Sequence, residues 1–165
     1  MRYSVTHHYD ASADDVLALL TDFDAVRAKY EALGHSDVEL VERTERNGAV
    51  SIVTKRVVPM DVPGFAKKIL SPKNRVTQTD SWTAPDAKGV RNGTFTVDAK
   101  GVPVKVSGVL RLAPGAKGGC VSEIAATVEC KVPLIGGKIA DFVGADTKKA
   151  IDHELEFNKD RLARR

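Results

Sequence analysis

Two ionisable residues near the C-terminus, Asp146 and His153, have types and a spacing that could do chemistry. They are seven positions apart, so on an α-helix they share one face and lie roughly 10.5 Å apart along the axis, too far to touch. A carboxylate and an imidazole facing one cavity can act as general acid and base, or can orient a polar group of a ligand. The alternative is structural, with Asp146 reaching water and His153 hydrogen-bonded to a neighbour.

Polar partners for this pair are available on predicted strands. A buried carboxylate or imidazole needs such a partner. Gln78 and Asp80 share strand parity with Val76 and Trp82, and His7 lies on the first predicted strand. These side chains would face the helix across a common interior.

Other reactive arrangements are missing from the sequence. His7 and His8 are adjacent on a predicted strand and therefore point to opposite faces, and there is no His-x-x-x-His or Cys-x-x-Cys spacing. The segment Gly136-Gly137-Lys138 lacks the upstream glycine and the downstream Ser or Thr of a P-loop, and no Gly-x-Ser-x-Gly nucleophile elbow occurs. We therefore expect neither a metal nor a cofactor.

The two cysteines, Cys120 and Cys130, are ten residues apart on one predicted strand. At about 3.3 Å per residue they lie roughly 33 Å apart, too far for an intrachain disulfide. We expect buried thiols on the face that also carries Ile124, Ala126 and Val128.

Asp146 and His153 must be positioned by one long helix, predicted from Pro133 to Leu162. Its apolar residues recur at helical spacing and form a single stripe that needs a large partner. The stripe contains Ile135, Ile139, Phe142, Val143, Ala150 and Phe157.

The partner predicted for this helix is a sheet. Apolar and polar residues alternate through the middle of the chain, as in antiparallel strands with one buried face. The loops are short enough for neighbours to pair in order, as a meander of about six strands plus the first. Asn47-Gly48 is a strong hairpin signal. The predicted strands are 2–9, 37–45, 49–58, 75–83, 90–98, 102–112 and 119–131.

Two short helices are predicted directly after the first strand. Residues 12–15 resemble a capping box, and residues 21–24 offer a second cap for a helix that stops at Gly34. The segment 59–74 fits no strand, although 64–70 has the pattern of a short amphipathic helix. Residues 55–75 hold six Lys or Arg against one Asp, so this segment is either a solvated loop or a lid that makes transient contact with an anionic membrane or head group.

Composition fits a single domain over residues 1–165. The sequence is 42% apolar and 28% charged, and a net charge of +3 is too small to indicate nucleic-acid binding. The sequence contains no run of about 18 apolar residues, so we do not expect an integral membrane protein. The N-terminus has no apolar signal region, so we expect a cytoplasmic protein.

The element order resembles the helix-grip fold of the START-like, Bet v 1-like (SRPBCC) superfamily. The local marks are residues 10–16, which open the first helix, and residues 131–139, which open the last and are similar to those of an uncharacterised bacterial branch. The resemblance implies an α+β fold, with a curved antiparallel sheet of about six or seven strands, two short helices after strand 1 and a long C-terminal helix packed across the sheet. It implies an internal cavity for lipids, polyketides or aromatic compounds, but no particular reaction.

We therefore expect a carrier or sensor that binds a hydrophobic small molecule between sheet and helix. One alternative is a polyketide cyclase-like, dehydratase-like or hydrolase enzyme using Asp146 and His153 as acid and base, and another is a co-chaperone-like, partner-binding module. The oligomeric state is left open. The residues predicted to contact the ligand are Val76, Gln78, Asp80, Trp82, Phe95, Val97, Val104, Val106, Leu110, Ile124, Ile139, Phe142, Asp146, His153 and Phe157.

Overall fold

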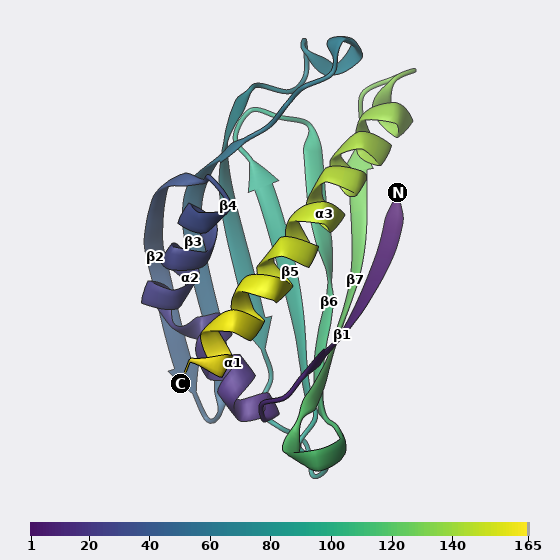
Figure 1. Ribbon diagram of the computed structural model, residues 1–165. Coiled ribbons are helices and arrows are strands. Elements are labelled where there is room, and N and C mark those ends of the chain that lie inside the picture. Colours follow the sequence, from purple (N-terminus) through teal and green to yellow (C-terminus); the bar gives the residue numbers. More distant parts are fainter. Residues whose placement is uncertain (165) are drawn as a thin grey trace.

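The computed structural model describes residues 1–164 and shows one curved sheet folded around a long C-terminal helix (Figure 1). All seven strands are antiparallel, in the order β1-β7-β6-β5-β4-β3-β2, which confirms the predicted meander and shows that the first strand pairs with the last. The strands are β1 (Arg2–Tyr9), β2 (Ser36–Arg46), β3 (Ala49–Pro59), β4 (Lys73–Trp82), β5 (Arg91–Ala99), β6 (Val104–Pro114) and β7 (Cys120–Cys130).

Two short helices, α1 (Ala13–Thr21) and α2 (Phe23–Ala32), follow β1 as predicted. The Ser12 hydroxyl accepts a hydrogen bond from the backbone N–H of Asp15 at 3.1 Å, and the Asp22 carboxylate accepts one from Ala25 at 3.0 Å. Each cap satisfies a backbone donor that the first helical turn leaves free. These local bonds fix where the chain turns from β1 toward β2.

The side chains that face the interior from β6 and β7 are the ones predicted from the alternation of apolar and polar residues. On β6, Val104, Val106 and Leu112 are buried, whereas Val109 on the opposite face is 57% exposed. On β7 both cysteines are free thiols of the inward-facing parity, Cys120 buried and Cys130 partly buried. The concave face of the sheet is therefore the apolar one.

The helix α3 (Gly136–Ala163) crosses this concave face, as Figure 1 shows. The apolar stripe predicted for it is right in part: Ile139 and Val143 are fully buried, but the buried face is rotated away from Phe142 and Phe157, which are only partly buried. The helix also turns small residues inward, and a Cβ at Gly144 would fall 2.5 Å from the Met1 sulfur. Its fully buried positions are Gly136, Ile139, Ala140, Val143, Gly144, Leu155 and Asn158.

The basic segment 59–74 forms only one 3-10 turn, Gly64–Ala66, in place of the predicted amphipathic helix. Ala66 and Leu70 are buried in the core, while Lys67 and Lys68 are exposed. The backbone N–H of Met60 donates to the carbonyl of Pro72 at 2.9 Å and draws the two ends of the segment together. The segment thus covers one end of the interior, with its charges outward. None of the helices in residues 1–164 combines the length and apolarity of a membrane span.

Candidate ligand-binding site

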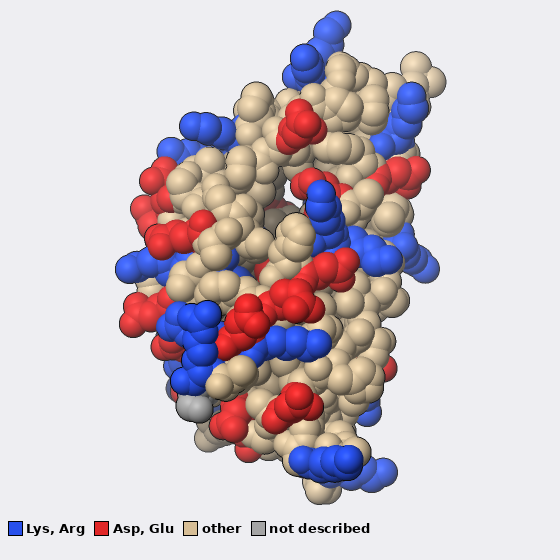
Figure 2. Space-filling model, in the orientation of Figure 1, with Lys and Arg blue, Asp and Glu red and all other residues tan. Residues whose placement is uncertain are grey.

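A cavity of about 400 Å³ lies between α3 and the concave face of the sheet. Figure 2 shows a hollow on this face of the molecule, between the surface over α3 and the surface over α2 and the neighbouring strands. The volume falls within the roughly 300–1,000 Å³ that is typical of small-molecule sites.

The cavity wall is mainly apolar along β5 and β6 and along part of α3. Phe95, Val97 and Val104 line it on the sheet side, and Val143 and Ile151 line it on the helix side. Most of the residues predicted to contact a ligand are part of this wall, because strand parity places them on the concave face; their role in binding stays a prediction. Those that line the cavity are Val76, Gln78, Asp80, Trp82, Phe95, Val97, Val104, Val106, Leu110, Ile124, Asp146 and His153.

Three predicted contacts, Ile139, Phe142 and Phe157, do not line the cavity. Ile139 is fully buried in a hydrophobic cluster with residues of β6 and β7, and Phe142 packs against the same cluster. Phe142 and Phe157 lie beside the inward face of α3, from which Ala150 and Leu155 line the cavity.

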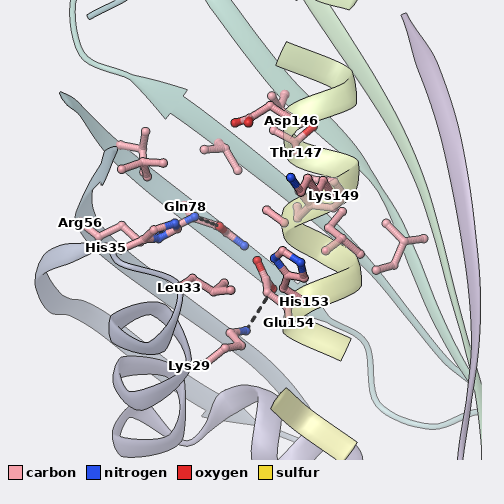
Figure 3. A pocket seen from close by; sticks show the side chains of 18 of the residues that line it. Lys29, Leu33, His35, Arg56, Gln78, Asp146, Thr147, Lys149, His153 and Glu154 are labelled. Atoms are coloured by element: carbon pink, nitrogen blue, oxygen red, sulfur yellow. Dashed lines mark hydrogen bonds and ion pairs between the residues drawn. The ribbon is translucent and has the colours of Figure 1, made fainter. Parts of the chain in front are cut away.

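Asp146 and His153 both line the cavity on α3 (Figure 3). Asp146 is partly buried, and this burial raises the pKa of its carboxyl, with Lys149 acting in the opposite direction. His153 is exposed and therefore belongs to the rim. The predicted partner His7 does not line the cavity, whereas Gln78 and Asp80 do.

One end of the cavity is polar, and most of its residues were not predicted from the sequence. Lys29 comes from α2, His35 from the loop before β2, Arg56 from β3, Gln78 and Asp80 from β4, and Glu154 from α3. Figure 3 shows these side chains, except Asp80, converging from both walls. Parity would have identified Arg56, because Val50, Ile52 and Thr54 on the same face of β3 are buried.

Arg56 and Gln78 are at the centre of this polar end. The Arg56 guanidinium donates from Nη2 to Gln78 Oε1 at 2.9 Å and from Nε to His35 Nδ1 at 3.1 Å. Its Cζ lies 3.8 Å from the centroid of the Tyr30 ring, whose hydroxyl donates to the same Gln78 oxygen at 3.2 Å. The Gln78 amide nitrogen in turn donates to both Asp80 oxygens, at 3.1 and 3.2 Å.

Burial shifts the titration of several groups in this network. Burial raises the pKa of Asp80, which the Gln78 hydrogen bonds and the Lys29 charge oppose. Burial and the neighbouring Arg56 charge lower the pKa of His35 to about 4. His35 is therefore neutral at pH 7, which is the state in which its Nδ1 can accept the Arg56 bond.

Lys29 and Glu154 connect α2 to α3 beside this network, with Nζ 3.3 Å from Oε2. Burial on its own would lower the pKa of Lys29, but Tyr30, Glu154 and Asp80 together hold it above its ordinary value. Lys29 is therefore charged, and its charge is matched. Taken together, the cavity offers an apolar wall for a hydrocarbon body and an ordered set of donors for a polar end.

Comparisons with known proteins agree with this architecture. The model of the family "Protein of unknown function (DUF2505)" matches residues 4–162. The chain is 23% identical over 163 residues to the uncharacterized protein Rv0481c of Mycobacterium tuberculosis, an alignment that covers 94% of this chain and 92% of that protein.

Solved structures show the same fold at low sequence identity. A START superfamily protein from Mycobacterium smegmatis superposes with a TM-score of 0.57 at 15% identity, covering 98% of each chain. The lipid transfer and protein localization domain of human StarD13 (DLC2) has a TM-score of 0.62 at 12% identity, covering 96% of this chain and 75% of that one. The expected resemblance is thereby confirmed: this chain belongs to the DUF2505 family and has the START/Bet v 1-like helix-grip fold.

Proposed function

We propose that this protein binds one hydrophobic or amphipathic small molecule in the cavity between the sheet and α3, as a carrier or sensor. The observation that carries the proposal is the cavity of about 400 Å³, mainly apolar along β5 and β6 and polar at one end. Sites for small organic molecules combine such walls with a few placed polar groups. The similarity to a StarD13 domain described as a lipid transfer domain supports the same class of ligand.

Transient membrane contact is part of this proposal. Leu134 is fully exposed, and Phe65 is 40% exposed with Lys138 Nζ 4.9 Å from its ring centroid. The segment 59–74 and the start of α3 extend at the same end of the molecule (Figure 1). Exposed Lys67 and Lys68 accompany these apolar side chains, a combination that suits an anionic lipid surface.

Native mass spectrometry of the purified protein tests the binding function. A mass above that of the chain, and a lipid, polyketide or aromatic compound in the solvent extract, would support the carrier. If the mass is that of the chain alone, titration with a fluorescent hydrophobic probe follows, and failure to saturate at one site per chain would reject the proposal.

Enzymatic proton transfer is a second candidate, favoured by the raised pKa of Asp146 at the cavity rim. An aspartate that holds a proton at higher pH than usual can act as a general acid, as a cyclisation or dehydration would require. The expected result is that His153→Ala or Asp146→Asn abolishes turnover of a bound polyketide-like compound while its binding persists. A partner-binding module remains a third prediction, for which Leu40 and Val41 on the edge strand β2 are the exposed apolar residues to test.

A further inference from the structure

Arg56 carries a buried charge that has no counter-ion. Only 7% of the residue is exposed, and its three polar or aromatic contacts are the neutral groups His35, Gln78 and Tyr30. Its Nη1 is buried without a hydrogen-bond partner among residues 1–164. Buried charges in proteins are normally paired, because desolvation of an isolated ion is costly.

The two carboxylates nearest to this network are already engaged. Glu154 forms its ion pair with Lys29 at 3.3 Å. Asp80 receives both hydrogen bonds of the Gln78 amide nitrogen, which separates it from the guanidinium. Within the described residues, no carboxylate oxygen lies within 4.0 Å of Arg56. The protein therefore supplies no anion at this position, although it buries the cation there.

The guanidinium is also held in place. Nε is fixed by His35, Nη2 by Gln78, and the planar face by the Tyr30 ring beneath it. A donor fixed in this way loses little conformational entropy when it binds an acceptor. The polar end is thus arranged before any ligand arrives.

We propose that Arg56 recognises the head group of the ligand, and that the ligand is an apolar monocarboxylic acid whose carboxylate is the counter-ion of the Arg56 guanidinium. This inference rests on the proposed binding function. One unpaired positive charge near Asp80 and Glu154 suits a single negative charge better than a phosphate, whose second charge the two carboxylates would repel. The hydrocarbon body would lie along Phe95, Val97 and Val104.

A pair of probes that differ only in the head group tests this assignment. Dodecanoate and dodecan-1-ol have the same chain, so the cavity wall treats them alike, and calorimetry gives the affinity of each. We expect wild type to bind dodecanoate at least tenfold more tightly than the alcohol. Arg56→Met, which keeps an apolar stem, should remove this preference, so that the variant binds the two probes with similar affinity. Lys55→Met is the matched control, because Lys55 is the exposed neighbour of Arg56 on β3.

The outcomes separate the two proposals. Equal affinity of wild type for both probes, or an unchanged preference in Arg56→Met, would overturn the role of Arg56 while leaving the cavity function intact. Binding of neither probe would overturn both. If Arg56→Met does not fold, ¹³C-carboxyl-labelled dodecanoate in the wild-type protein decides: beside a guanidinium its pKa falls below that of the free acid. A pKa equal to or above the free value would reject the assignment.

Discussion

Lys29 on α2 and Glu154 on α3 form an ion pair of 3.3 Å that joins the two helices beside the cavity. Its side chains are 8% and 22% exposed, so each charge depends on the other for most of its polar contact. Because the pKa of Lys29 is raised, Lys29 keeps its charge throughout the neutral range and loses it only at strongly alkaline pH. The pair therefore contributes across the whole neutral range.

Glu154→Gln should destabilise the protein at neutral pH by about 1–3 kcal/mol, because it leaves the Lys29 ammonium buried without a counter-ion. Urea unfolding measures the change. Asp160→Asn, on an exposed position of the same helix, should stay within about 0.5 kcal/mol of wild type. Equal stability of the two variants would show that the pair does not hold α2 to α3.

His35 should make stability depend on acid pH. Burial and the Arg56 charge lower its pKa to about 4, so between the ordinary pKa and about 4 the unfolded chain binds a proton that the folded protein excludes. The free energy of unfolding therefore falls as pH falls through this window, by of order 1–2 kcal/mol from this residue. Urea unfolding at pH 7 and pH 5 measures the loss.

The comparison variant for this effect is His35→Asn, whose amide oxygen can still accept from Arg56 but does not titrate. Its pH dependence should be shallower than that of wild type. Asp80 and Asp146 have raised pKa values and act in the opposite direction in both proteins, so they cancel in the comparison. Parallel pH profiles would mean that His35 titrates normally.

Filling the cavity should abolish binding without unfolding the protein. Val97→Phe adds volume on the cavity wall and should lower the affinity for a hydrophobic probe by tenfold or more, as measured by fluorescence titration. Val109→Phe adds the same kind of side chain on the opposite face of the sheet, where Val109 is 57% exposed, and should leave affinity unchanged. Phe142→Ala should lower stability but keep affinity, because Phe142 packs outside the cavity. Loss of probe binding in Phe142→Ala alone would contradict the observed helix rotation.

Gly108 allows the Phe95 ring to lie over β6. A Cβ at this position would clash with the Ala125 carbonyl oxygen and lie 2.7 Å from the Phe95 ring. Gly108→Ala should therefore cost about 1–3 kcal/mol through overpacking, and it should displace a cavity-lining ring. Gly137→Ala, where no atom lies within 4 Å of a Cβ, should be neutral or stabilising in urea unfolding. A neutral Gly108→Ala would show that β6 and β7 shift easily.

Flotation with vesicles tests the membrane contact. Wild type should bind vesicles that contain phosphatidylserine and should lose binding at high salt. The double variant with Lys67→Glu and Lys68→Glu should bind much less, whereas Lys117→Glu, in the exposed loop between β6 and β7, should bind as wild type does. If wild type and both variants bind the vesicles equally, the membrane contact is made by another surface.

Local sequence patterns determined the elements of this protein and the faces of its strands. Alternation has a period of two residues, which places Val76, Gln78, Asp80 and Trp82 together on the concave face. The caps at Ser12 and Asp22 act on backbone groups three residues away, so they can be recognised without knowing the rest of the fold. The fold class followed from the order of these elements.

Tertiary structure alone decided how α3 is rotated. Hydrophobicity favoured the face with Phe142 and Phe157, but close approach to the sheet and to Met1 requires small residues such as Ala140 and Gly144. Glycine and alanine add little to an apolar pattern, so the pattern could not predict which face of α3 packs against the sheet. Ile139 and Phe142 consequently lie in the core next to the cavity and not in its wall.

The polar end of the cavity was likewise decided by the tertiary structure. Lys29, Arg56, Gln78 and Glu154 come from four elements spread over 126 positions of the chain, and no local spacing relates them. Their bonds form only when the sheet curves around α3 and brings α2 against it. Parity can place a charged residue such as Arg56 on the inner face, but only the assembled fold decides which buried charge meets an oppositely charged partner and which does not.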